Sequence, residues 1–123
     1  MTIYENLTIK FNNFKDVKTV LKKHKNLKIN ILFSNQYLSL QGPHAMKEFY
    51  ILFDNKMVNL IPETGKNIGL ALTIIELGVK KMAISKNLDK DLLKKIKSLA
   101  KKKGIEILTT ERFKKIKRIN DLI

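Results

Sequence analysis

The stretch Gly65–Ser85 (GKNIGLALTIIELGVKKMAIS) constrains the fold more than any other part of the chain. Its apolar residues recur at i, i+3, i+4 and i+7, the spacing of one helical face, which falls on Ile68, Ala71, Leu72 and Ile75. Gly78 is expected to end this helix, because glycine readily takes the left-handed conformation that stops one. The following residues, Lys81–Ser85, predict a short central strand. A buried helix that leads into a strand is half of an α/β crossover, so the sequence predicts the α/β class.

Length and composition predict a single domain of 123 residues that is large enough for a real core. With 44% hydrophobic residues, the chain is expected to fold rather than to stay disordered. No apolar run approaches the length of about 18 residues that a membrane span needs. The first residues lack the basic-then-apolar pattern of a secretory signal. We therefore expect a cytoplasmic protein with no membrane partner.

The order of the predicted elements indicates a mixed sheet. Strands are predicted over 3–11, 28–33, 49–54, 57–62, 81–85 and 105–108, and helices over 14–24, 68–77, 89–103 and 111–119. The turn Asp54-Asn55-Lys56 joins two of these strands into a hairpin, and the alternating elements after it give the sheet a parallel half. The single domain then consists of an N-terminal strand–helix segment (1–25), a core (26–110) and a basic C-terminal helix (111–123).

The net charge of +14 predicts attraction to polyanions or to an anionic cofactor. Only two of the 25 cationic residues are Arg, although Arg is favoured for reading phosphates and bases. A general compositional bias toward Lys is favoured over a dedicated nucleic-acid surface as the source of the excess. Nucleic-acid binding is therefore the alternative function, with contacts predicted at Lys80, Lys81, Lys86, Arg112, Lys114, Lys115 and Arg118.

The chain has no cysteine, which excludes disulfides, thiolate nucleophiles and Cys-ligated metal sites. His24 and His44 are the two remaining nitrogen ligands or bases. His24 lies near the end of a predicted helix and is interpreted as a solvated residue. No pair of carboxylates stands at a diagnostic spacing, so we predict that the protein is not an enzyme.

From Lys28 to Thr109 the sequence resembles the dinitrogenase iron–molybdenum cofactor-binding domain family. The matching segments are a first strand, a strand–turn–strand, a helix opening, a helix exit and a final strand: 28–31 (KINI), 49–56 (FYILFDNK), 65–68 (GKNI), 78–80 (GVK) and 104–107 (GIEI). The resemblance implies a ribonuclease-H-like three-layer fold, in which a mixed sheet of about five strands is flanked by helices. Residues 1–25 add a strand and a helix to that fold.

The resemblance also implies a non-enzymatic carrier or scaffold for an iron–molybdenum or iron–sulfur cofactor, which would pass this cluster to a cofactor-receiving protein. His44 corresponds to the ligating histidine of the family and is the implied metal ligand. The implied cofactor contacts are Gly42, His44, Gly65, Lys66 and Asn67. The turn 86–89 has no glycine where the family has a glycine-containing loop.

Plainer interpretations of these residues stay open. His44 also fits a loop residue that is hydrogen-bonded to the backbone. Gly65-Lys66-Asn67 either presents donors to an anion at a helix start or forms a simple turn. Met82 is either a soft ligand or core filler. The lysines of the helix 89–103 are interpreted as a solvated face.

Overall fold

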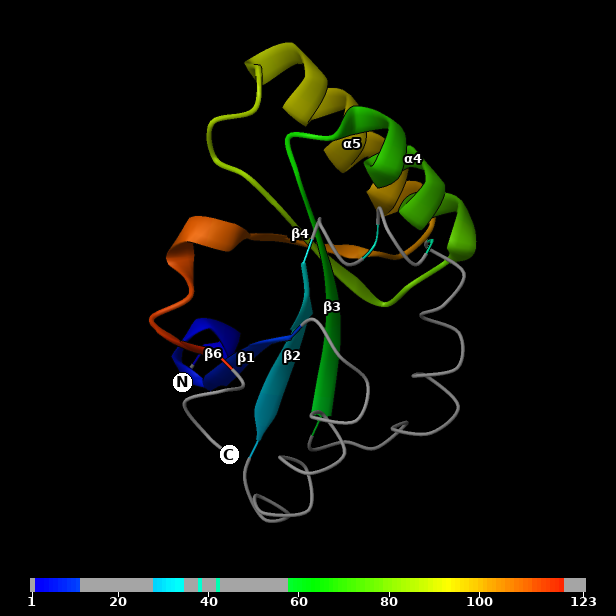
Figure 1. Cartoon of the computed structure of the whole chain (residues 1–123). Coiled ribbons are helices and arrows are strands. Elements are labelled where there is room, and N and C mark those ends of the chain that lie inside the picture. The colour runs from blue at the N-terminus through cyan, green and yellow to red at the C-terminus, as the bar shows by residue number, and fades with distance from the viewer. Residues whose placement is uncertain (1, 12–27, 35–37, 39–41, 43–57, 119–123) are drawn as a thin grey trace.

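The computed structural model describes residues 2–11, 28–34, 38, 42 and 58–118. Its elements in chain order are η1 (Ile3–Glu5), β1 (Leu7–Phe11), β2 (Ile29–Phe33), β3 (Val58–Gly65), α4 (Ile68–Leu77), β4 (Lys81–Ile84), α5 (Lys90–Lys102), β5 (Glu106–Thr109), η3 (Thr110–Arg112) and β6 (Lys115–Arg118). Both η elements are short 3-10 turns. Figure 1 shows the sheet with the two helices beside it. Among the described residues, no helix is both long and apolar enough to cross a membrane.

The described strands form one six-stranded sheet in the order β5-β4-β3-β2-β1-β6, and every pairing is parallel. At the centre, Ile31 of β2 lies opposite Ile9 of β1 and Leu60 of β3. Strand β2 is buried along its whole length, as expected of a parallel strand that is covered on both faces. The prediction of an α/β protein is confirmed.

Helices α4 and α5 cover the same face of the sheet, which we call the helix face. The connections β3–α4–β4 and β4–α5–β5 each advance one strand in the same direction, and right-handed crossovers of this kind place both helices on one side. The core beneath them includes Ile74 of α4, Ile96 of α5 and Met82 of β4. Met82 has no exposed surface, which favours a packing role over a ligand role for its thioether.

The opposite face, which we call the inner face, is enclosed because the sheet curls. Strands β5 and β6 are its two outer edges, yet only residues 110–114 connect them. Five strand spacings of a flat sheet span roughly 24 Å, whereas a link of this length reaches at most about 20 Å. The two edges must therefore approach each other. The link passes over the inner face, where Phe113 belongs to one buried cluster with Leu32 and Ile61.

Tyr4 joins the two edges of the curled sheet. Its hydroxyl oxygen accepts the Thr109 N–H at the end of β5 at 2.9 Å, and its carbonyl accepts the Lys114 N–H before β6 at 3.1 Å. Its ring packs edge-on against Phe113, with 5.0 Å between centroids. The Arg112 guanidinium lies 4.4 Å from the centre of the same ring. Tyr4 thus fixes the path of the link across the inner face.

A polar ladder crosses the inner face near the amino ends of the strands. Thr8, Asn30 and Asn59 are register neighbours on β1, β2 and β3. The Asn30 Nδ2 atom donates to the Ile3 carbonyl at 2.9 Å and to Thr8 Oγ1 at 3.0 Å, and Asn30 Oδ1 accepts from Asn59 Nδ2 at 3.0 Å. Thr8 and Asn30 are fully buried. The ladder therefore satisfies its own buried polar groups.

The prediction of a mixed sheet is wrong for the described part of the chain, where all six strands run parallel. The first strand of the predicted hairpin, 49–54, lies outside the described residues, as does the helix predicted over 14–24. Strand β3 pairs with β2 on one side and with β4 on the other. An apolar run such as 57–62 is typical of a strand buried on both faces, and its pattern does not reveal which strand lies beside it.

The basic helix predicted over 111–123 is also wrong for the described residues. Thr110–Arg112 forms a 3-10 turn, and Lys115–Arg118 forms β6, which pairs with β1. Lysines that flank an apolar residue are typical of an edge strand, because charge discourages further pairing. In a segment this short the pattern does not separate a helix from a strand. Strand β1 itself lies inside the sheet, between β2 and β6.

Candidate functional site

Polar side chains gather on the inner face at the carboxyl ends of the strands. Lys10 lies near the end of β1, Glu63 lies near the end of β3, and Ser85 directly follows β4. Because the strands are parallel, these ends meet at one edge of the sheet, and α/β sheets bind their ligands at this edge. Together with Thr110 and Glu111 of η3, these residues form what we call the carboxyl-edge site.

Glu63 is the buried carboxyl group of this site. The residue is 8% exposed, and its Oε1 atom lies 3.7 Å from Nζ of Lys10. Its Oε2 atom is buried without a hydrogen-bond partner among the described residues, and so is Oγ1 of Thr110. Burial raises the pKa of Glu63 above the ordinary 4.5; Lys10 opposes this rise, and the charge of Glu111 adds to it. The site therefore offers a carboxyl group whose pKa is raised and whose Oε2 atom has no hydrogen-bond partner among the described residues.

The backbone around Glu63 is irregular. The register between β3 and β4 shifts between Glu63 and Gly65, and irregularities of this kind re-aim side chains at strand ends. Gly65 has a φ of +58°, a conformation that favours glycine. Its carbonyl accepts the Ser85 N–H at 3.2 Å, which ties the ends of β3 and β4 together.

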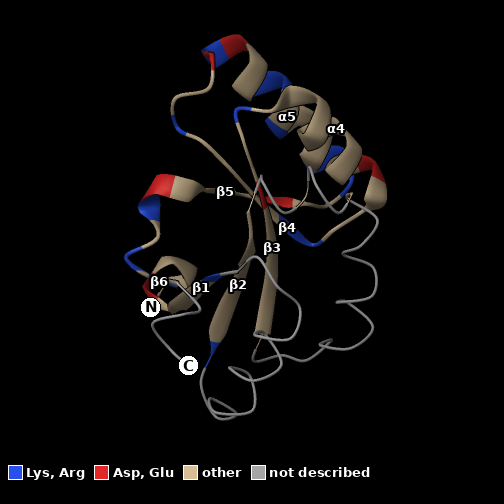
Figure 2. Ribbon diagram, in the orientation of Figure 1, with Lys and Arg blue, Asp and Glu red and all other residues tan. Residues whose placement is uncertain are grey.

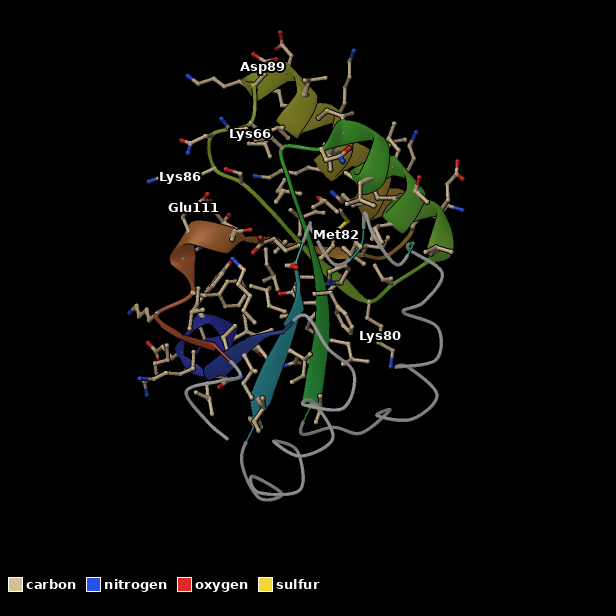
Figure 3. All side chains as sticks on the ribbon, viewed as in Figure 1. Lys66, Lys80, Met82, Lys86, Asp89 and Glu111 are labelled. Atoms are coloured by element: carbon tan, nitrogen blue, oxygen red, sulfur yellow. The ribbon has the colours of Figure 1, made fainter. Side chains whose placement is uncertain are left out.

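Glu111 fixes the turn that follows β4. Its Oε2 atom accepts the Ser85 hydroxyl at 2.9 Å, and its Oε1 atom accepts the Lys86 N–H at 2.7 Å. Desolvation raises the pKa of Glu111, but the hydrogen bonds from Lys86 and Ser85 outweigh it, so the pKa lies below 4.5. Figure 3 shows Glu111 and Lys86 at the same edge. The two donors of this turn, the Ser85 hydroxyl and the Lys86 N–H, therefore bind a carboxylate that belongs to the protein itself.

The structure places three of the predicted cofactor contacts at the same edge. Gly65 ends β3, Lys66 is exposed, and Asn67 precedes α4. The Oδ1 atom of Asn67 accepts a backbone N–H of α4 at 3.0 Å, so this side chain caps the helix. Gly42 has a φ of +84°, whereas His44 lies outside the described residues.

The residues predicted to bind nucleic acid are not brought together. Lys80 and Lys81 lie at the amino end of β4, and Lys86 lies beyond its carboxyl end. Figure 3 shows Lys80 and Lys86 far apart. The remaining members lie in η3 and β6 or between them: Arg112, Lys114, Lys115 and Arg118. We find no single surface that contains the whole set.

Sequence reasoning missed Lys10, Glu63 and Glu111. Glu63 follows the apolar residues 60–62 at the end of a predicted strand and precedes the turn at Gly65. An acidic residue at that position is a signal for a ligand contact in an α/β sheet. Glu111 gives no such signal, because it reaches Lys86 from 25 residues away.

No family model matches the chain, and no curated protein sequence is significantly similar to it. Within the described residues, no group of three or more His, Cys, Asp or Glu side chains is placed to hold a metal ion. The functional inference therefore rests on the geometry of the carboxyl-edge site.

Proposed function

We propose that the protein is a non-enzymatic binding protein that holds a small polar ligand at the carboxyl-edge site, against Glu63. The observation that carries this proposal is the buried Glu63 Oε2 atom, which has no partner among the described residues. A buried polar atom without a hydrogen bond costs about 1–3 kcal/mol. A ligand that supplies the missing bond recovers part of this cost on binding.

The contrast with the polar ladder strengthens the proposal. Asn30 is also buried on the same face, yet both its amide nitrogen and its oxygen have partners within the protein. In Glu63, one oxygen lies near Lys10 and the other has no hydrogen-bond partner in the described part of the chain. The unsatisfied group is the one at the edge where parallel sheets bind ligands.

The surroundings of Glu63 define the class of ligand. Its free oxygen accepts from a hydroxyl or amine group, or donates to an acceptor when the carboxyl is protonated. Lys66 and Lys86 are exposed at the same edge, beyond the ends of β3 and β4. Their charges favour a ligand that also carries an anionic group. A small hydroxylated or aminated anion satisfies both requirements.

A narrower proposal names the ligand as an iron–molybdenum or iron–sulfur cofactor, with His44 as its ligand to the metal. It is supported by the sequence resemblance and by the position of Gly65, Lys66 and Asn67 at the carboxyl edge. The ribonuclease-H-like arrangement that accompanies this family stays a prediction from the resemblance. The parallel order of the described strands does not support that arrangement.

The proposal is tested on protein purified without oxygen. Native mass spectrometry detects a retained ligand, while iron and molybdenum analysis and visible absorption identify a cluster. Glu63→Gln removes the carboxyl with little change of shape. Glu106→Gln is the matched control, because the exposed Glu106 carboxylate lies 4.0 Å from Lys81 at the other end of β4. We expect the wild type and Glu106→Gln to retain the same small mass, and Glu63→Gln to lose most of it.

The two forms of the proposal give different results. A metal-free organic adduct supports the small polar ligand, whereas an adduct that contains iron supports the cluster and makes His44→Ala the next variant. Retention that is unchanged in Glu63→Gln, or a wild type that carries no adduct, contradicts the proposed site.

A further inference from the structure

A second charged surface lies on the exposed side of α5. Six of its 13 residues are Lys and one is Asp, which leaves a net charge of +5. All six lysines are exposed, and Figure 2 shows Lys positions in blue along the helix. Within the described part of the chain, none of their ammonium groups lies within 4.0 Å of a carboxylate. The described residues therefore provide no carboxylate that pairs with this positive surface.

Four of these lysines form a row that we call the lysine stripe: Lys90, Lys94, Lys97 and Lys101. Their spacing of i, i+4, i+7 and i+11 keeps them within about 60° of the helix circumference and spreads them over roughly 16 Å. Another side of the helix, with Ile96 and Ala100, packs into the core on the helix face. The stripe is therefore held on a helix whose position is fixed by packing.

We propose that the lysine stripe binds the phosphate backbone of a nucleic acid without reading its sequence. One strand of a duplex carries a phosphate about every 3.4 Å along the axis, so roughly five phosphates lie beside a row of about 16 Å. Four ammonium groups in a row suit that density. The stripe contains no Arg, and Lys acts as a point charge rather than as a bidentate reader of bases.

The packing of α5 favours a nucleic acid over an anionic membrane. A helix that lies on a membrane inserts its apolar face among the lipids. The apolar face of α5 already packs into the core. Of its large apolar side chains, only Leu99 is exposed, at 40%. The surface that α5 offers is therefore charged, with little apolar area to insert.

The dependence of binding on salt tests the proposal. The probe is a fluorescein-labelled 20-base-pair DNA duplex of mixed sequence, and its anisotropy is measured against protein at 50–200 mM NaCl. If all four lysines contact phosphates, the logarithm of the binding constant falls with the logarithm of salt at a slope of about −3.6. The affinity then drops roughly 150-fold over this range. For the double variant Lys94→Gln/Lys97→Gln we expect a slope of about −1.8 and a drop of roughly 12-fold.

The matched control is Lys28→Gln/Lys117→Gln, which makes the same charge change at two exposed positions, one directly before β2 and one on β6. This control should keep the wild-type slope, and circular dichroism should show all three proteins equally folded. Three results would overturn the proposal: no duplex binding at 50 mM NaCl, an equal change of slope in both double variants, or binding to phosphatidylserine vesicles without binding to the duplex.

Discussion

Replacing Tyr4 with Phe tests whether the edges of the curled sheet are held together through this residue. The change removes only the hydroxyl oxygen, which accepts the Thr109 N–H at 2.9 Å, and keeps the ring against Phe113. Tyr4 is 9% exposed, so water has little access to replace the lost bond. A buried N–H without an acceptor costs about 1–2 kcal/mol. We expect the free energy of unfolding to fall by that amount.

Urea unfolding followed by circular dichroism measures this loss. A domain of this size has an m value of about 1.5 kcal/mol per molar urea, so the midpoint should fall by about 1 M. Amide hydrogen exchange provides the local measurement. The Thr109 amide should exchange faster in Tyr4→Phe, by more than the overall loss of stability explains.

Phe113→Leu is the matched control for this prediction. It removes the edge-on ring contact but keeps the hydrogen bond between Tyr4 and Thr109. It should destabilise the protein by about 1 kcal/mol without a specific effect on the Thr109 amide. If Tyr4→Phe changes neither the midpoint nor the exchange of Thr109, the reasoning about the sheet edges is refuted.

Three further changes are predicted to alter stability. Because the pKa of Glu63 is raised, the folded protein binds more protons than the unfolded chain above pH 4.5. The stability of the wild type should therefore fall relative to that of Glu63→Gln as the pH rises through the folded pKa. A stability difference that stays constant between about pH 4 and pH 8 in urea unfolding contradicts this prediction. The effect of pH on stability has the opposite sign for Glu111. Its lowered pKa stabilises the fold above pH 4.5, and this contribution is lost as the pH falls through the folded pKa. The loss of unfolding free energy in Glu111→Gln should therefore shrink on acidification and not grow. Asn30→Ala removes three hydrogen bonds of the polar ladder and should cost about 3 kcal/mol, against about 1 kcal/mol for Asn59→Ala; equal losses in urea unfolding would contradict the ladder.

The elements that the sequence predicts correctly are those defined by nearby residues. Gly78, with a φ of +74°, ends α4, and α5 begins after Asp89, whose side chain makes no capping hydrogen bond. Gly104 follows α5 with a φ of +72°. Helix periodicity and caps act over one or two turns, so a single sequence shows them. The strands β2, β4 and β5 were predicted for the same reason, from short apolar runs between turns.

The pairing of the strands depends on residues that are far apart in the sequence. The Tyr4 hydroxyl accepts the Thr109 N–H from 105 positions away in the sequence, and no local pattern indicates this contact. Two other pairings also join distant segments of the sequence: β2 pairs parallel with β3, and β6 pairs parallel with β1. Local composition therefore predicts a hairpin partner for β3 and a C-terminal helix, whereas β3 lies between two parallel strands, β2 and β4, and Lys115–Arg118 forms β6.

The candidate site was predictable in part. The turn Gly65-Lys66-Asn67 lies at the carboxyl edge, as a glycine turn before a helix suggests. Glu63, two residues earlier, was visible in the sequence, but its significance depends on burial that only the curled sheet creates. The contribution of Glu111 to the site depends on the link between β5 and β6. The sequence instead predicts a helix over these residues, so it does not indicate the link.

The link 110–114 connects the stability of the sheet to the chemistry of the site. At one end it provides Thr110 and Glu111, one with a buried free oxygen and the other with a charge that raises the pKa of Glu63. At the other end Phe113 and the Lys114 N–H contact Tyr4. Because one short segment makes both sets of contacts, closing the sheet also places the polar groups over Glu63. The burial that raises the pKa of the Glu63 carboxyl is therefore a consequence of how the two edges meet.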